Sequence, residues 1–308
     1  MDKDFLSYPD WQATADTLHL YLQMAGKVKL EHCYPEPEWG HIRMPLTVQG
    51  IGTGIIPGPK SNFEIYFNLR RHHVDVQAGN DLRTRLELTD GLSVAEFYRQ
   101  LMGALEFIEA PTSINTDPQE FHDPVPFESD TRHHTYDRHA VELFLDNLHF
   151  AQRSLTQFLA PVRGKVSAPH YWFGTMDLSG TIYSGQASPY PGRGTIAENC
   201  FDERFCEFGF WPGDPSSTEP SFYVMPYPFL SNIGSYPSML APSKAEFSPR
   251  ASEFFFTLKD AFSYDDPQQA VVDFCRTSFD ILQRMDKWSG IEWITEPLTY
   301  PAQAHRPA

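Results

Sequence analysis

Three titratable side chains stand among large aromatic residues, a combination that can carry acid–base chemistry. They are His170, Asp177 and Glu207. A carboxyl group surrounded by rings is poorly solvated, so its pKa rises and it can act as a general acid, and an imidazole exchanges protons near neutral pH. We predict these three as candidate catalytic residues. The alternative for Glu207 is a carboxylate that points outward from an edge strand.

The segment 169–183 alternates as a β-strand whose one face would mix rings, hydroxyls and a carboxylate, as ligand sites often do. On this face we expect Tyr171, Phe173, Thr175, Asp177, Ser179 and Thr181. His170 would lie on the opposite face, so it could share a pocket with Asp177 only if a bulge, at Gly174, intervened. The alternative is a strand with a solvated polar side and no site.

Seven further side chains are predicted to bind a small ligand. They are Trp39, His41, Lys27, Lys165, Trp172, Arg193 and Trp211. The tryptophans offer stacking surfaces, and the two lysines occupy matching places in a repeated Gly-Lys-Val stretch. The arginine lies in a glycine-rich loop, 184–194, where backbone amides and a guanidinium can hold an anion. We assign no metal and no cofactor to these residues.

A polar line follows the first predicted helix. Asp16, His19, Gln23 and Lys27 recur at steps of three or four residues. Such a line is typical of the solvated stripe of an amphipathic helix. The alternative is a line that faces a polar cavity.

Hydrophobic periodicity and end signals predict the elements that must position these residues. Helices are expected over 10–25, ended by Gly26, and over 93–109, 138–159 and 266–288. Strands are expected over 41–49, 63–69, 74–76, 83–88, 169–183, 205–211, 221–227 and 252–258. Hairpin-length links make the strands antiparallel, so the predicted fold class is α+β.

Four short motifs occur twice in the same order, which indicates an internal duplication. One pair is Gly26-Lys27-Val28 and Gly164-Lys165-Val166. Each half would be a helix, about four antiparallel strands and a helix, and the two halves would pack together. The predicted boundaries are 1–110 for the first repeat, 111–137 for a connector rich in proline and acid, 138–290 for the second repeat, and 291–308 for a loose tail.

The connector contains imidazoles and carboxylates, which are common metal ligands. They are His122, Asp123, Glu128, Asp130, His133, His134 and Asp137. None of the helical pairings that preset ligand geometry is clear among them, so a solvated acidic linker is the alternative to a metal site.

Composition limits the classes of function. The chain has 308 residues and a net charge of −16, which repels phosphate backbones and argues against nucleic acid and anionic membranes as partners. No apolar run approaches the roughly 20 residues that span a bilayer, and no secretory signal is visible. The four cysteines form no Cys-x-x-Cys pair, which favours reduced thiols. We expect a cytoplasmic protein, a monomer or a homodimer.

Several motifs together resemble an uncharacterised bacterial family, a domain of unknown function. They are Trp11-x-x-Thr14-x-x-Thr17-Leu-His-Leu20-x-x-Gln23-x-x-Gly26-Lys27, Asp123-Pro-Val-Pro-Phe127, His170-Tyr-x-Phe-Gly174 with Asp177-Leu178, and Gly209-Phe-Trp-Pro-Gly213. The resemblance covers residues 9 to about 288 and implies a soluble bacterial protein without an assigned activity. Members of that family tend to have Ser-Gly-Arg where this chain has Ser184-Gly185-Gln186, which weakens an anion site in this loop.

Three functional hypotheses follow, and none of them decides whether the protein is an enzyme. The first is a pocket between two pseudo-symmetric halves that binds, and could transform, a small polar or aromatic molecule. The second is a metal-dependent hydrolase that uses the connector side chains. The third is a non-catalytic protein-interaction module whose exposed aromatic residues contact another chain.

Overall fold

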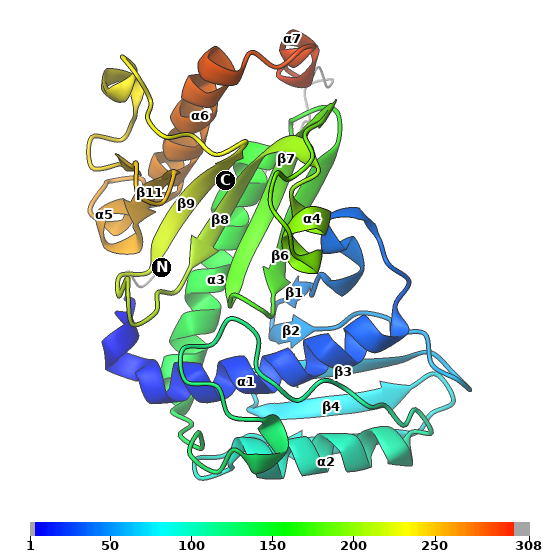
Figure 1. Cartoon of the computed structure of the whole chain (residues 1–308). Helices are drawn as coiled ribbons and strands as arrows, with labels where there is room; N and C mark the ends of the chain where they lie inside the picture. Colours follow the sequence, from blue (N-terminus) through cyan, green and yellow to red (C-terminus); the bar gives the residue numbers. More distant parts are fainter. Residues whose placement is uncertain (1–3, 299–308) are drawn as a thin grey trace, which may run out of the picture.

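The computed structural model describes residues 4–298, which form two antiparallel sheets with helices packed on them (Figure 1). The α-helices are α1 Tyr8–His32, α2 Val94–Phe107, α3 Arg138–Leu159, α4 Thr195–Cys200, α5 Leu258–Phe262, α6 Pro267–Asp286 and α7 Ile291–Ile294. The 3-10 turns are η1 Pro37–Ile42, η2 Phe127–Ser129 and η3 Pro237–Met239. The predicted α+β class is therefore confirmed.

The first sheet is a meander whose strands follow one another in chain order. Its strands are β1 Leu46–Thr47, β2 Gly50–Gly52, β3 Phe63–Asn68, β4 His73–Ala78 and β5 Arg83–Glu87. Aromatic contacts bind it to its helices, because Tyr21 of α1 stacks on Phe97 of α2 with ring centroids 4.2 Å apart. Phe67 of β3 lies against the same Phe97 ring. This sheet and its two helices make the lower part of the molecule in Figure 1.

The second sheet has the strand order β10-β11-β9-β8-β7-β6. Its strands are β6 Val166–Trp172, β7 Asp177–Ala187, β8 Glu203–Trp211, β9 Ser221–Tyr227, β10 Glu246–Ser248 and β11 Glu253–Thr257. Helices α3 and α6 cover one face, where Phe158 meets Phe208 and Phe274 meets Phe256. Since side chains alternate along a strand, the other face of the same strands is free to carry a site.

The two sheets share one hydrophobic core. Buried residues of both sheets and of α1, α2, α3 and α6 form one contiguous cluster. The backbones also meet, because Met44 and Tyr171 exchange two N–H···O bonds of 2.9 and 3.1 Å. This bridge holds the edge strand β6 against the first half of the chain.

Most predicted elements agree with the structure, and two differ in an informative way. The segment 169–183 is two strands joined by a four-residue turn, 173–176, instead of one strand. The expected end of the first helix at Gly26 is also wrong, because α1 continues to His32. At Gly26 a Cβ atom would lie 2.0 Å from the Phe173 ring, so the glycine allows the turn to pack on the helix.

Two smaller predictions have mixed outcomes. Of the strand expected over 41–49, only β1 is extended beyond the Met44 bridge, and η1 occupies its beginning. Of the predicted tail, α7 packs with Ile294 buried, while residues 299–308 lie outside the described part of the chain.

The proposed internal duplication is not confirmed. Both halves contain a helix, an antiparallel sheet and a helix, but the sheets have five and six strands and different strand orders. Lys27 lies inside α1, whereas Lys165 lies just before β6, so the matching Gly-Lys-Val stretches occupy unlike elements.

Candidate functional site

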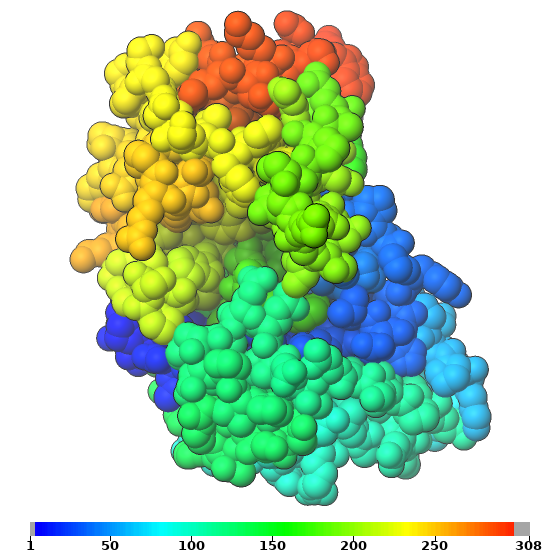
Figure 2. Space-filling view, in the orientation of Figure 1, coloured from blue at the N-terminus to red at the C-terminus, as the bar shows by residue number. Residues whose placement is uncertain are grey.

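A cavity of about 520 Å³ lies on the face of the second sheet that α3 and α6 leave uncovered. The strands β7, β8, β9 and β11 form its floor, and η1, α4 and the connector border it. Figure 2 shows the surface hollowed at this place, between the connector and the segment that contains α4. Pockets of this size hold small molecules.

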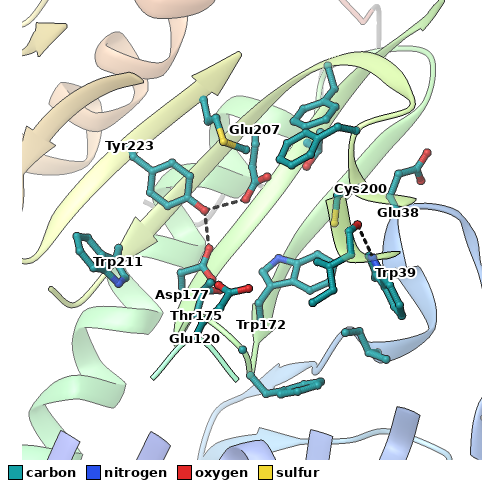
Figure 3. A pocket seen from close by; sticks show the side chains of 18 of the residues that line it. Glu38, Trp39, Glu120, Trp172, Thr175, Asp177, Cys200, Glu207, Trp211 and Tyr223 are labelled. Atoms are coloured by element: carbon teal, nitrogen blue, oxygen red, sulfur yellow. Dashed lines mark hydrogen bonds between the residues drawn. The ribbon is translucent and has the colours of Figure 1, made fainter. Parts of the chain in front are cut away.

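The strand register brings three polar side chains together on this floor (Figure 3). Asp177 begins β7, Glu207 lies in β8, and Tyr223 lies in β9. In the register, Glu207 is opposite Thr181 and Tyr223 is opposite Gly209, so all of these residues share one face of the sheet.

Gly209 lets Tyr223 cross its neighbouring strand. A Cβ atom at position 209 would lie 2.2 Å from the Tyr223 ring. The ring can therefore lie over β8, and its hydroxyl reaches past that strand. A glycine within a strand often marks such a close approach.

The Tyr223 hydroxyl joins the two carboxyl groups. Its oxygen lies 2.5 Å from Oδ2 of Asp177 and 2.8 Å from Oε1 of Glu207. A hydroxyl has one proton to donate, so only one carboxylate can accept it. The second contact is a hydrogen bond only if the other carboxyl group keeps its own proton. The geometry thus favours a cluster that shares a proton.

Electrostatics point the same way. Burial, with a further contribution from the charge of Glu207, raises the pKa of Asp177 to about 7. Burial also raises the pKa of Glu207, and it raises the pKa of Tyr223 well above its usual value. Asp177 is only 5 % exposed, so little water can solvate its ionised carboxylate. Asp177 and Glu207 therefore keep their protons to a higher pH than exposed carboxyl groups do.

Neighbouring hydroxyls and an indole hold these carboxyl groups in place. The Thr175 hydroxyl donates to Oδ1 of Asp177. The Trp172 Nε1–H donates to the Ser179 hydroxyl at 2.8 Å, and Ser179 in turn hydrogen-bonds Glu207. Because the turn 173–176 brings Trp172 opposite Asp177, the indole and the carboxyl groups line one pocket.

Aromatic residues supply most of the remaining wall. Three tryptophans line the cavity, namely Trp39, Trp172 and Trp211. The Trp39 Nε1–H donates to the carbonyl of Ile196 at 3.2 Å, which ties η1 to α4 at the border. Other rings in the wall are Phe173, Tyr183, Phe201, Phe205, Tyr223 and Phe255.

The sequence-predicted residues fall into two groups. The cavity is lined by Asp177, Glu207, Trp39, Trp172 and Trp211. The other predicted residues lie outside its lining: His170, His41, Lys27, Lys165 and Arg193.

His170 shares a sheet face with Asp177, contrary to the expectation from strand alternation. The turn 173–176 reverses the chain, so Trp172 pairs with Asp177 and His170 pairs with Ser179. His170 still does not line the cavity, and its Nδ1 contacts the Ala168 carbonyl at 2.6 Å.

The two lysines predicted to bind a ligand have different partners. The Lys27 ammonium donates to the carbonyls of Asn115 and Asp117, near the beginning of the connector. Lys165 instead pairs with Glu38 and Glu203 at the second sheet.

The remaining two predicted ligand-binding residues differ in exposure. His41 is buried, and its Nδ1 accepts a hydrogen bond from the backbone N–H of Glu36 at 3.1 Å. Arg193 is exposed in the loop before α4. Their roles as ligand-binding residues stay predictions.

The polar line of α1 faces neither water nor a cavity. It holds the connector. The Gln23 amide donates to the Gln119 carbonyl and accepts from the Gln119 N–H, both at 2.8 Å. His19 contacts the carbonyl of Phe173 at 2.9 Å. Through these contacts α1 fixes both Gln119 and the turn that border the cavity.

Sequence reasoning missed several residues of the site. Tyr223 joins the carboxyl groups, and Glu38, Glu120 and Glu253 add three further acids to the lining. The glycine at position 209, in the middle of a predicted strand, was a local signal for close approach. No local signal links Glu253 to Asp177, because their meeting depends on the order of the strands.

The connector side chains have other partners than a metal. His133 contacts Asp130 at 2.6 Å, and His122 lies 3.5 Å from Asp16. Asp137 accepts hydrogen bonds from the first amides of α3. Within residues 4–298, no three His, Cys, Asp or Glu side chains converge as a metal site would require. This arrangement does not favour the metal-dependent hydrolase hypothesis.

Fold and site together define an α+β protein with an acidic, aromatic cavity on its second sheet. The chain belongs to the family of unknown function DUF5996, whose profile matches residues 4–293. This confirms the resemblance to a domain of unknown function. No curated protein and no solved structure matches the chain. None of the helices in the described range is long and apolar enough to span a bilayer.

Proposed function

We propose that the protein binds a small molecule with an apolar or aromatic body in this cavity. The observation that carries the proposal is a cavity of about 520 Å³ with three tryptophans in its wall. Apolar walls with a few convergent polar groups are typical of ligand sites. The aromatic rings would cover the body of the ligand, and the carboxyl cluster would orient its polar end.

The same cluster supports proton transfer to or from the ligand. Asp177 and Glu207 share a proton through Tyr223, and both have raised pKa values. A carboxyl group that stays protonated near neutral pH can act as a general acid. His170 is not part of this proposal, because it lies outside the cavity lining.

A fragment screen tests the binding proposal. We expect aromatic fragments to raise the melting temperature and to change tryptophan fluorescence, because half of the six tryptophans line the cavity. Trp172→Ala should weaken these fragments, whereas Trp293→Ala, at a residue 56 % exposed outside the cavity, should not. If no fragment class binds, or if both variants respond alike, the proposal is wrong.

A further inference from the structure

The acids of the cavity have no basic counterpart within its lining. Five carboxyl residues border the space, namely Glu38, Glu120, Asp177, Glu207 and Glu253. Among the described residues of the chain, no lysine, arginine or histidine lines it. Lys165 pairs with Glu38 from outside the cavity, so that one acid is compensated. The acids of the floor, Asp177, Glu207 and Glu253, have no such basic partner among the lining residues.

Glu253 is the clearest uncompensated acid. It lines the cavity from β11, and within residues 4–298 its carboxyl group has neither a hydrogen bond nor an ion pair. Burial and the nearby Glu207 and Asp177 charges raise its pKa to about 7. Three acids of the same sheet thus face a common space without a cation.

The rings of the wall suit a cation as well. An ammonium group over an aromatic face is attracted by the ring quadrupole, most strongly where water is excluded. Two rings of the wall already contact cationic side chains that do not themselves line the cavity. Arg43 lies 5.9 Å from the Trp172 ring centroid, and the Lys165 ammonium lies 4.2 Å from that of Tyr183.

We infer that the cavity is a binding site for an organic cation, an ammonium group on an apolar body. The inference rests on the proposed function and names its ligand class. The ammonium would lie between Asp177, Glu207 and Glu253, and the tryptophans would cover the apolar body. An anion is disfavoured because the lining has acids and no basic residue to meet it, in a chain with a net charge of −16.

Two other ligand classes fit the wall less well. A bare metal ion needs at least three converging oxygen, nitrogen or sulfur ligands, and the described part of the chain offers no such group. A sugar needs many hydrogen-bond partners of both kinds, whereas most of this wall is apolar or aromatic. The uncharged polar side chains of the lining, apart from the indoles, are Gln119, Thr175, Thr181, Tyr183, Cys200 and Tyr223.

Cation binding should release protons. The groups that face the ammonium position are Asp177, Glu207, Glu253 and Tyr223 from the floor, with Glu120 and the Glu38–Lys165 pair at the border. A bound positive charge favours the ionised carboxylates and lowers their pKa. Affinity for a cation should therefore rise as the pH rises from 5 to 8, while affinity for a neutral ligand should not.

Three probes with the same ring test the inference by calorimetry. They are 2-phenylethylammonium, 2-phenylethanol and phenylacetate, which differ in charge. We expect the ammonium compound to bind about tenfold or more tightly than the alcohol, and phenylacetate to bind most weakly. Titrations in buffers of different ionisation enthalpy should show proton release for the ammonium compound alone.

Matched variants locate the effect. Glu253→Gln should reduce the preference for the ammonium compound about threefold to tenfold without unfolding the protein, because this carboxyl group has no partner to lose within the described chain. Asp177→Asn should act in the same direction. Glu87→Gln makes the same change of net charge at an exposed residue of β5 and should leave the preference unchanged.

The outcomes separate this inference from the proposed function. If the alcohol or phenylacetate binds as well as the ammonium compound, the cavity binds ligands but the cation inference is wrong. If no probe of the three binds while neutral fragments do, the inference is again overturned and the proposed function stands. If neither the probes nor the fragments bind, both are overturned. A preference that Glu87→Gln reduces as much as Glu253→Gln also contradicts the inference.

Discussion

At the scale of single residues, the site depends on carboxyl groups that keep their protons at a pH at which exposed carboxyl groups are ionised. The Tyr223 hydroxyl touches two carboxyl groups and can donate to only one of them. Asp177 is 5 % exposed, so its ionisation would leave a poorly solvated negative charge, which is energetically unfavourable. Such unfavourably buried carboxyl groups are common at functional sites, and these lie on the cavity floor.

Asp177→Asn should therefore stabilise the protein at high pH. The folded-state pKa of Asp177 is raised to about 7 from 3.8, so the folded protein holds the proton that the unfolded chain loses. This contribution to stability is complete below about pH 4 and is lost as the pH rises through 7. A shift of about 3 pKa units corresponds to roughly 4 kcal/mol, so the variant should gain up to about 4 kcal/mol over the natural chain at pH 8 and little at pH 4.

Urea unfolding of both proteins from pH 4 to 8 measures this difference. The buried His19 has a pKa lowered to about 4 and adds an opposite slope below pH 6.5, but it contributes equally to both proteins and cancels. Exposed Glu87→Gln is the control and should show no gain. A difference between variant and natural chain that stays constant with pH would contradict the assignment.

Gly209→Ala should remove the Tyr223 hydroxyl from the cluster. The added Cβ would lie 2.2 Å from the Tyr223 ring, so the ring must leave its place over β8. Tyr223→Phe removes the same hydroxyl without moving the ring. In a double-mutant cycle, the second change should therefore cost little once the first is present, a coupling on the order of 1 kcal/mol.

The control for the added methyl group is Gly103→Ala in α2. Nothing lies within 4 Å of its new Cβ, so this change should stabilise the helix by about 0.5–1 kcal/mol. Additive effects of Gly209→Ala and Tyr223→Phe would show that the glycine does not position the tyrosine.

At the scale of elements, side chains of α1 hold the connector in place. Its polar line meets the connector backbone at several carbonyls, and the Gln23 amide pairs with Gln119 much as a strand would. The same helix carries Gly26, on which the turn 173–176 packs. One helix thus sets the positions of two separate pieces of the cavity border.

Gln23→Met should loosen the connector. The change removes both hydrogen bonds to Gln119 from a residue that is fully buried, and it leaves that backbone N–H and C=O without partners. We expect a loss of roughly 1–3 kcal/mol in stability. Hydrogen exchange should become faster over 115–122 and stay unchanged in α3.

The matched control is Gln157→Met on the exposed face of α3. It should change neither the stability nor the exchange of the connector by more than about 0.5 kcal/mol. Equal exchange of 115–122 in the natural chain and in Gln23→Met would mean that other contacts hold the connector.

At the scale of the whole molecule, the two sheets behave as one body with one core. The buried cluster runs through both sheets, and the ring contact between Trp11 of α1 and Phe144 of α3 joins the halves at 5.1 Å. The cavity lies where η1 and the connector of the first half border the second sheet. Its shape therefore depends on both halves being folded together.

Unfolding should accordingly be a single cooperative transition. Circular dichroism, tryptophan fluorescence and the protection of peptides from 63–87 and 203–227 should all lose their native signals at the same urea concentration. Two separate midpoints for the two peptides would show that the halves are independent domains. In that case the boundaries predicted at 110 and 138 would mark real domain limits.

The sequence alone determined what depends on near neighbours. Periodicity and capping residues predicted α3 and β9 with the ends that the structure shows, because these signals act over a few residues. The alternation over 169–183 failed because the turn 173–176 continues the same polar pattern, while Met176 adopts a left-handed backbone that no local signal announces. The types of residue in the site were visible as well, since acids stand among tryptophans.

Only the tertiary structure decided which of these residues meet. Asp177 and Tyr223 are 46 positions apart, and Lys165 and Glu38 are 127 apart, so their contacts arise from strand order and helix packing. Long-range register is a property of the whole core, in which many weak contacts are satisfied together. For this reason the sequence identifies the individual carboxyl and aromatic residues, whereas only the folded structure shows that they line one cavity.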